Sequence, residues 1–216
     1  MSTIEEYTQR LLNVGELTEA ELPDIVEGRV TEADLRSRGV KLDVDTHPAR
    51  TAVLLAAKSI AEIDQETTYY ADFVELFCAS LERFMKLPAV ILPTPIPMPT
   101  LEQKHGLWGV SQRVTGDVSI VDGILARDRV FLALASRYAG FDLTEMDDDT
   151  VDALEEFLNV VNGLYIVELA NRKVEPDLEF PRAAEDVVPR GSHQMALRLY
   201  TAVGHFLLIL STDAFL

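Results

Sequence analysis

Five prolines fall within residues 88–99, and they constrain the whole chain. Proline fixes the backbone angle φ and has no amide donor, so this segment must be extended and cannot be an interior strand. Helical patterns precede it, and the strand patterns follow it. The prolines therefore separate a helical first part from a second part that carries a sheet.

Hydrophobic periodicity predicts the elements on both sides of the prolines. Helices are expected before them at 3–13, 49–63 and 67–86, with a further helix start at Thr31. After them, helices are expected at 128–139 and about 147–169, and strands at 107–110, 118–125, 178–181, 195–201 and 205–211. This order predicts one α+β unit in which long helices pack on a mainly antiparallel sheet. We expect an N-terminal helical extension of unknown role at 1–63 and a main domain at 64–216.

The composition excludes several classes of function. The 216 residues carry a formal net charge of −17 at pH 7, which argues against binding to nucleic acid or to an anionic membrane surface. The sequence contains no apolar run long enough to span a membrane and no evident signal peptide, so a cytoplasmic protein is expected. The single cysteine, Cys78, excludes an internal disulfide and any cysteine-based zinc site.

The long helix at about 147–169 has two faces. Its apolar residues step by three and four positions and form one stripe that faces the core: Val151, Leu154, Leu158, Val161 and Tyr165. A second stripe has the same spacing: Asp152, Glu156, Asn159 and Gly163. At ~100° per residue, Glu156 lies nearly opposite the core stripe, and Asn159 is its neighbour on the surface. We expect Asn162 on the same side.

A polar face on a surface helix needs no functional explanation, because one side must meet water. Two details still favour a functional face. Asparagine is a poor helix former, yet Asn159 and Asn162 both lie within the helix. Gly163 costs about 1 kcal/mol relative to alanine. Three carboxylates at 147–149 suggest a metal ion, although capping of the helix start explains them more simply.

This helix resembles the working helix of the CheC/CheX-type chemotaxis phosphatases. The family pattern has Asp or Ser, then Glu four residues later, then Asn three later, then a small residue after four more. The residues that match it are Asp152, Glu156, Asn159 and Gly163. The motif alone is short, but its place after a strand and a helix is also typical of the family.

The likeness extends beyond the motif. The strand and helix across 116–140, the helix at 67–86 and the closing strand pair are similar to the family, so the resemblance covers about residues 65–216. Pro181 stands about one residue before the place where the family has a proline. The single copy of the motif resembles the CheX branch. It implies a CheX-like sandwich of helices on a sheet and a possible homodimer.

The resemblance implies an enzyme that hydrolyses the aspartyl phosphate of a CheY-like response regulator in two-component signalling. Asn159 would enter the receiver's site, where its amide could both donate to and accept from the attacking water. Glu156 would pair with the receiver's lysine. Asp152, Asn162 and Gly163 would contribute to partner binding. No cofactor of its own is implied, because the receiver would supply Mg²⁺.

Two other interpretations stay open at this point. A non-catalytic module of the same fold could dock a response regulator or another signalling protein, and the unmatched residues 1–63 motivate that alternative. The other is an unrelated hydrolase. Against it, the four histidines show no metal-ligand spacing, and the sequence has neither a Gly-rich phosphate loop nor a serine in a nucleophile-elbow pattern.

Overall fold

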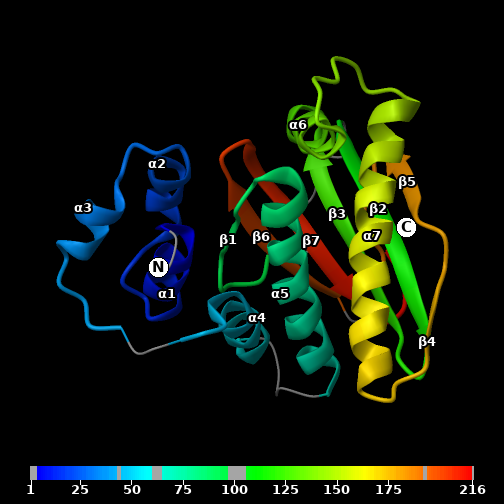
Figure 1. Ribbon diagram of the computed structural model, residues 1–216, viewed down its shortest axis with the longest axis horizontal. Helices are drawn as coiled ribbons and strands as arrows, with labels where there is room; N and C mark the ends of the chain where they lie inside the picture. The colour runs from blue at the N-terminus through cyan, green and yellow to red at the C-terminus, as the bar shows by residue number, and fades with distance from the viewer. Residues whose placement is uncertain (1–3, 43–44, 60–64, 97–105, 192–193, 216) are drawn as a thin grey trace.

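The computed structural model describes residues 4–42, 45–59, 65–96, 106–191 and 194–215. In these ranges seven strands form one antiparallel sheet, and long helices cover one of its faces (Figure 1). The strands are β1 (Val90–Ile91), β2 (Leu107–Gly116), β3 (Ile120–Arg127), β4 (Pro176–Leu178), β5 (Arg182–Glu185), β6 (Gln194–Thr201) and β7 (Gly204–Ser211). The helices are α1 (Ile4–Asn13), α2 (Leu22–Val26), α3 (Glu32–Arg36), α4 (Pro48–Lys58), α5 (Gln65–Met85), α6 (Asp128–Ala139) and α7 (Asp148–Asn171), with a 3-10 turn at Glu19–Glu21. The predicted α+β class is confirmed.

The sheet has the strand order β1-β6-β7-β3-β2-β4, and β5 also pairs with β2. Both predicted hairpins form, as β2 with β3 and as β6 with β7. Within its described residues, 88–96, the proline-rich segment supplies the edge strand β1, which agrees with a segment that cannot form an interior strand. Prolines 97 and 99 lie outside the described residues. The single strand expected at 178–181 is wrong, because β4 ends at Leu178 and β5 begins at Arg182.

The main core lies between the sheet and helices α4, α5, α6 and α7. Aromatic rings join α5 to α7, with ring centroids 5.6 Å apart for Phe77 and Phe157 and 5.4 Å apart for Phe73 and Tyr165. Helix α4 contributes Ala52 to the same core, so the boundary expected near residue 63 falls between two helices that pack together. A smaller apolar cluster covers the opposite face of the sheet.

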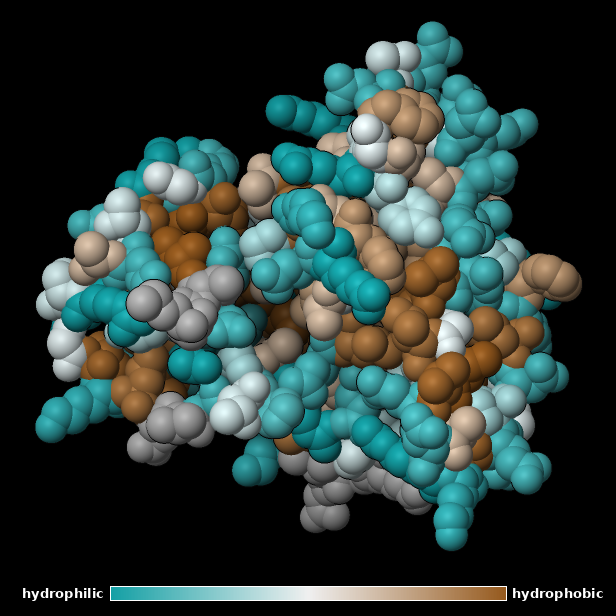
Figure 2. Space-filling view, viewed as in Figure 1, coloured by the Kyte–Doolittle hydropathy of each residue, from teal (hydrophilic) through white to brown (hydrophobic). Residues whose placement is uncertain are grey.

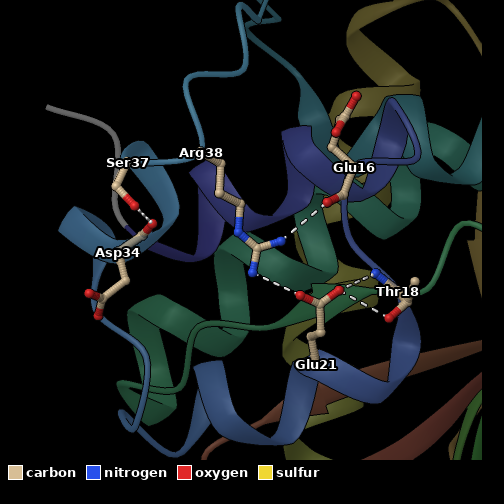
Figure 3. A network of polar contacts seen from close by, with 6 residues as sticks. All are labelled: Glu16, Thr18, Glu21, Asp34, Ser37 and Arg38. Atoms are coloured by element: carbon tan, nitrogen blue, oxygen red, sulfur yellow. Dashed lines mark hydrogen bonds and ion pairs between the residues drawn. The ribbon is translucent and has the colours of Figure 1, made fainter.

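Helices α1, α2 and α3 form a unit with a core of its own, which we call the N-terminal unit. Leu11, Leu22 and Leu35 are its buried centre. On the surface of the unit, the guanidinium of Arg38 donates to the Glu16 carbonyl (3.3 Å) and to the Glu21 carboxylate (2.8 Å) (Figure 3). The unit packs on the edge of the sheet at β1 and β6, and Figure 1 shows it at the end of the molecule away from α7.

One side chain of the N-terminal unit closes the free edge of β1. The Gln9 amide nitrogen donates to the carbonyl of Ile91 (2.9 Å), and the Ile91 amide donates to the Gln9 carbonyl oxygen (2.7 Å). The side chain thus makes both hydrogen bonds that a neighbouring strand would make. An edge that would otherwise present unpaired backbone groups is satisfied in this way.

None of the described helices has the length and apolar character that a membrane span requires.

Candidate functional site

Helix α7 begins with a side-chain cap. Asp147 is extended and its carboxylate accepts a hydrogen bond from the amide of Thr150 (3.1 Å), which satisfies one of the free amides of the first turn. Asp148 and Asp149 occupy that turn, where the helix dipole favours negative charge. The described residues contain no group of three or more side chains that could hold a metal ion. The hydrogen bond to Thr150 makes Asp147 the N-cap of α7.

The two predicted faces of α7 are present. Leu154, Leu158, Val161 and Tyr165 are buried against the sheet and α5, while Val151 is half-buried. On the outer face, Asp152 and Glu156 are exposed, and Asn159 and Gly163 are half-buried. A methyl group added at Gly163 would meet no atom within 4 Å. Internal packing therefore does not require this glycine, although it weakens the helix.

The surface position expected for Asn162 is wrong. Asn162 is 0% exposed, and its amide nitrogen donates to Gln112 Oε1 (3.1 Å) and to Asp122 Oδ1 (3.0 Å). Three residues of helix turn the chain by about 300°, which places Asn162 about 60° from Asn159 on the core side. Direct contact of Asn162 with a partner is thus excluded in this structure, and the residue faces the sheet instead.

The carboxylate of Glu156 is exposed on the outer face of α7. Among the described residues its carboxylate makes no hydrogen bond or ion pair. Tyr138 of α6 senses this carboxylate, because its pKa is raised by burial and then by the negative charge of Glu156. The ring of Tyr138 packs edge-on against Phe157, with centroids 5.5 Å apart. An exposed carboxylate beside a rigid aromatic pair can receive a cationic group from outside.

Asn159 is held at one end of its amide only. Its carbonyl oxygen accepts a hydrogen bond from Gln112 Nε2 on β2 (2.9 Å). In the described part of the chain, no hydrogen-bond partner is found for its amide nitrogen. The sequence analysis expected this amide to both donate and accept at a reacting water. In the structure the amide oxygen of Asn159 is hydrogen-bonded to the sheet. The N–H₂ group is therefore the end of the amide that can bind a water as a donor.

Two residues beneath Asn159 were missed by the sequence analysis. Gln112 and Asp122 are buried, polar and directly paired across β2 and β3. Both lie on the strand face that packs under α7, where their neighbours two positions away are apolar, such as Val110 and Ile124. Polar residues at inward positions of an alternating pattern are therefore the signal that could have revealed them.

Asp122 has an unusual electrostatic environment. Burial raises the pKa of its carboxyl to about 8, although the hydrogen bond from Asn162 lowers it. Its Oδ2 atom has no hydrogen-bond partner among the described residues, and neither does Oδ1 of Asn162. A carboxyl group with this pKa is mostly neutral at pH 7.

The outer face of α7 changes character along its length. Its first half carries Asp152 and Glu156, whereas its second half presents Val160, Leu164 and Val167, the last 58% exposed. Figure 2 shows apolar surface in brown along α7 and toward α5. A face that joins carboxylates to an apolar patch is typical of a protein-binding surface.

The link between β4 and β5 borders this site. Gln112 Nε2, which donates one hydrogen bond to Asn159, donates its other hydrogen bond to the backbone carbonyl of Glu179 (2.8 Å). The next residue, Phe180, is 91% exposed, and the sequence analysis did not single it out. Phe180 is thus an exposed apolar side chain on the link whose backbone also binds Gln112.

Comparison with known proteins shows which solved structures share this fold. No protein-family model matches the chain, and no curated protein sequence matches it significantly. Among solved structures, it is similar to the chemotaxis protein CheX from Desulfovibrio desulfuricans, with a TM-score of 0.55 at 15% identity over 67% of this chain and 99% of that one. CheX from Vibrio vulnificus gives 0.54 at 14% identity, over 69% and 99% of the two chains. A CheC-like superfamily protein from Shewanella sp. PV-4 gives 0.52 at 13% identity, over 68% and 97%.

These three proteins are covered almost completely, so this chain contains the whole of their fold. The CheX-like sandwich expected from the resemblance is thereby confirmed. The remaining third of this chain has no counterpart in them.

Proposed function

We propose that this chain, which has the CheX-type fold, is a phosphatase for the aspartyl phosphate of a CheY-like response regulator. One observation carries the proposal: Glu156 and Asn159 lie side by side on the outer face of the longest helix, and the N-terminal unit lies away from them (Figure 1). The carboxylate of Glu156 and the amide nitrogen of Asn159 have no hydrogen-bond partner among the described residues. Both groups are therefore available to a docked protein.

Hydrolysis of an aspartyl phosphate requires few groups from the phosphatase itself. A water oxygen forms a bond to phosphorus while the bond from phosphorus to the aspartyl oxygen breaks, which yields inorganic phosphate and the receiver's carboxylate. In-line attack needs a positioned water. The N–H₂ group of Asn159 can donate to one lone pair of that water and leave the other lone pair for phosphorus. A neutral amide suits this role, because a carboxylate there would be repelled by the phosphoryl oxygens.

The partner completes the site. Glu156 would pair with a lysine of the receiver and so fix the angle at which α7 docks. The Mg²⁺ ion is expected to arrive with the receiver. Asp152 would extend the negative part of the surface. Gly163 would let the partner's backbone approach closely, and the absence of any internal need for this glycine supports that role.

The test is the decay of phosphate from a panel of phosphorylated receiver proteins, with and without the chain. We expect faster decay for at least one receiver, and an Asn159→Ala variant that loses about 100-fold of the acceleration while still binding the receiver. Asp142→Asn is the control, because this exposed carboxylate lies outside the site. Equal acceleration by wild type and Asn159→Ala would contradict the proposal.

A second candidate is a non-catalytic module that docks a response regulator or another signalling protein. The engaged carbonyl of Asn159 favours it, because only half of that amide is available to a water. The same experiment separates the two functions. Tight binding to a phosphorylated receiver with an unchanged decay rate would establish the docking module and exclude the phosphatase.

A further inference from the structure

A line of polar side chains runs under α7 through an otherwise apolar core. Asp122 on β3 accepts from Asn162 (3.0 Å), Asn162 donates to Gln112 on β2 (3.1 Å), and Gln112 donates to Asn159 (2.9 Å). Asp122 and Asn162 are 0% exposed, and Gln112 is 2% exposed. The line thus begins at a fully buried carboxyl and ends at the half-exposed amide of the proposed catalytic residue.

A buried line of polar side chains lowers the stability of the fold unless its groups are hydrogen-bonded. A polar group removed from water destabilises the fold unless it is hydrogen-bonded, and an apolar residue at each position would pack without that cost. Here two buried atoms still lack partners, Asp122 Oδ2 and Asn162 Oδ1. A protonated carboxyl and a primary amide can pair through two hydrogen bonds, and these are the two atoms that the second bond would join. Stability alone does not explain four polar residues in this place.

The hydrogen bonds leave one orientation for each amide. Gln112 Nε2 uses both of its N–H groups, one to Asn159 and one to the backbone carbonyl of Glu179 (2.8 Å), which can only accept. Asn162 Nδ2 also uses both of its N–H groups, one to Gln112 and one to Asp122. Turning any of these amides over would set donor against donor or acceptor against acceptor. The group of the sheet that faces Asn159 is therefore the N–H donor of Gln112, so the amide oxygen of Asn159 must point toward the sheet.

We propose that Gln112, Asn162 and Asp122 are positioning residues that hold the Asn159 amide in one orientation, with its N–H₂ group turned outward as a donor. The group that Asn159 recognises is then an acceptor, such as the oxygen of a water or of a phosphoryl group. The catalytic use of that donor rests on the proposed function. The orientation itself does not.

Hydrogen exchange of side-chain amides, followed by NMR on the ¹⁵N-labelled full chain, tests the orientation directly. We expect fast exchange at Asn159 Nδ2 and slow exchange at Gln112 Nε2 and Asn162 Nδ2, with Asn159→Ala assigning the first signal. Gln112→Glu reverses the polarity at the lower partner, because a carboxylate accepts only. Asn159 should then turn its N–H₂ group inward, and its exchange should slow by on the order of 10-fold or more. Slow exchange at Asn159 in the wild type would overturn the proposal.

Two further variants keep the test decisive. If the buried carboxylate of Gln112→Glu prevents folding, Gln112→Met removes the donor without adding charge and should shift the Asn159 side-chain signals. Asp142→Asn, on the surface outside the site, should leave them in place. Unchanged Asn159 signals in a folded Gln112→Met variant would overturn the positioning role.

An activity measurement separates this inference from the proposed function. With a phosphorylated receiver, Gln112→Met should lower kcat by on the order of 10- to 100-fold while KM stays within about twofold. Unchanged kcat in an active chain would refute positioning by Gln112. If the wild-type chain accelerates no receiver, the phosphatase proposal fails, and the exchange rates alone decide the orientation.

Discussion

Gln9 and Asn159, at opposite ends of the molecule, each bind the sheet through a side-chain amide, but they differ in how many ends of the amide are hydrogen-bonded. At the β1 edge, both ends of the Gln9 amide are bonded to the backbone of Ile91. Under α7, only the oxygen of the Asn159 amide is bonded, to Gln112. Gln9 is buried, whereas Asn159 reaches the surface.

The difference separates a structural amide from a recognition amide. When every donor and acceptor is satisfied within the fold, a substitution should change stability and leave function alone. When one end is held and the other faces outward, a substitution should change function with a smaller effect on stability. The N-terminal unit and the α7 face are therefore expected to respond to mutation in opposite ways.

The largest effect on function is expected at the outer face of α7. Glu156→Lys replaces the proposed partner of the receiver's lysine by a like charge, which should weaken receiver binding roughly 100-fold. The fold should be unaffected, because Glu156 is exposed and makes no ion pair among the described residues. Titration of the receiver by calorimetry measures the affinity. Glu82→Lys, the same charge change on the exposed surface of α5, is the matched control and should bind normally.

The opposite response is expected at the β1 edge. Gln9→Met leaves the amide and the carbonyl of Ile91 without their partners, and the free energy of unfolding should fall by roughly 2–6 kcal/mol at about 1–3 kcal/mol for each group. Denaturant unfolding measures the loss. Glu5→Gln on the same helix should stay within about 0.5 kcal/mol of wild type. Loss of phosphatase activity by folded Gln9→Met would break the separation between the two ends.

A pH-dependent effect is expected from the buried end of the polar line. The pKa of Asp122 is raised from 3.8 to about 8, chiefly by burial. Between these values the unfolded chain loses a proton that the folded chain keeps, so stability falls as pH rises and levels off above the folded pKa. Asp122→Asn removes this contribution. Across the window the wild type should lose about 1.4 kcal/mol more than the variant per pH unit.

Unfolding curves at several pH values check that slope. Asp142→Asn, an exposed carboxylate, should keep the wild-type slope. Equal slopes for Asp122→Asn and wild type would mean that Asp122 titrates normally in the folded chain. The carboxyl–amide pairing beneath Asn159 would then lose its support.

The smallest effect is expected where the N-terminal unit touches β6. Glu19 accepts hydrogen bonds from Arg198 and from the hydroxyl of Tyr200 (2.5 Å), and the bond from Tyr200 is the main reason that the pKa of Glu19 is lowered. The pair is partly exposed, so Glu19→Gln should cost only about 0.5–1 kcal/mol. The loss should be present at pH 7 and should vanish as pH falls through the lowered pKa. Glu16→Gln, on the exposed loop nearby, should show no such difference.

The sequence was sufficient for most elements and for the exposed half of the site. Periodicity placed α7 and its outer residues Glu156 and Asn159, because local spacing decides which face a helical residue occupies. It failed at Asn162, where a turn of about 60° from Asn159 separates the outer face from the core. Local spacing could not reveal the line from Asp122 to Gln112 either, because the register of β2 against β3 and the seating of α7 on both are tertiary facts.

The N-terminal unit shows the same limit. Its helices were partly predicted from periodicity, but nothing local to Gln9 indicates that its amide pairs with a residue 82 positions away. The boundary expected near residue 63 relied on the end of the family resemblance. Packing of Ala52 into the main core shows that α4 shares that core with α5.

The most direct measurement of the central claim is the rate of phosphate loss from a phosphorylated CheY-like receiver in the presence of wild type, Asn159→Ala and Gln9→Met. The Asn159 amide has a free N–H₂ group among the described residues, whereas both ends of the Gln9 amide are bonded within the fold. We therefore expect wild type and folded Gln9→Met to accelerate phosphate loss, and Asn159→Ala to accelerate it about 100-fold less. Acceleration that survives in Asn159→Ala, or that is absent in all three, would contradict a catalytic role for the outward amide of α7.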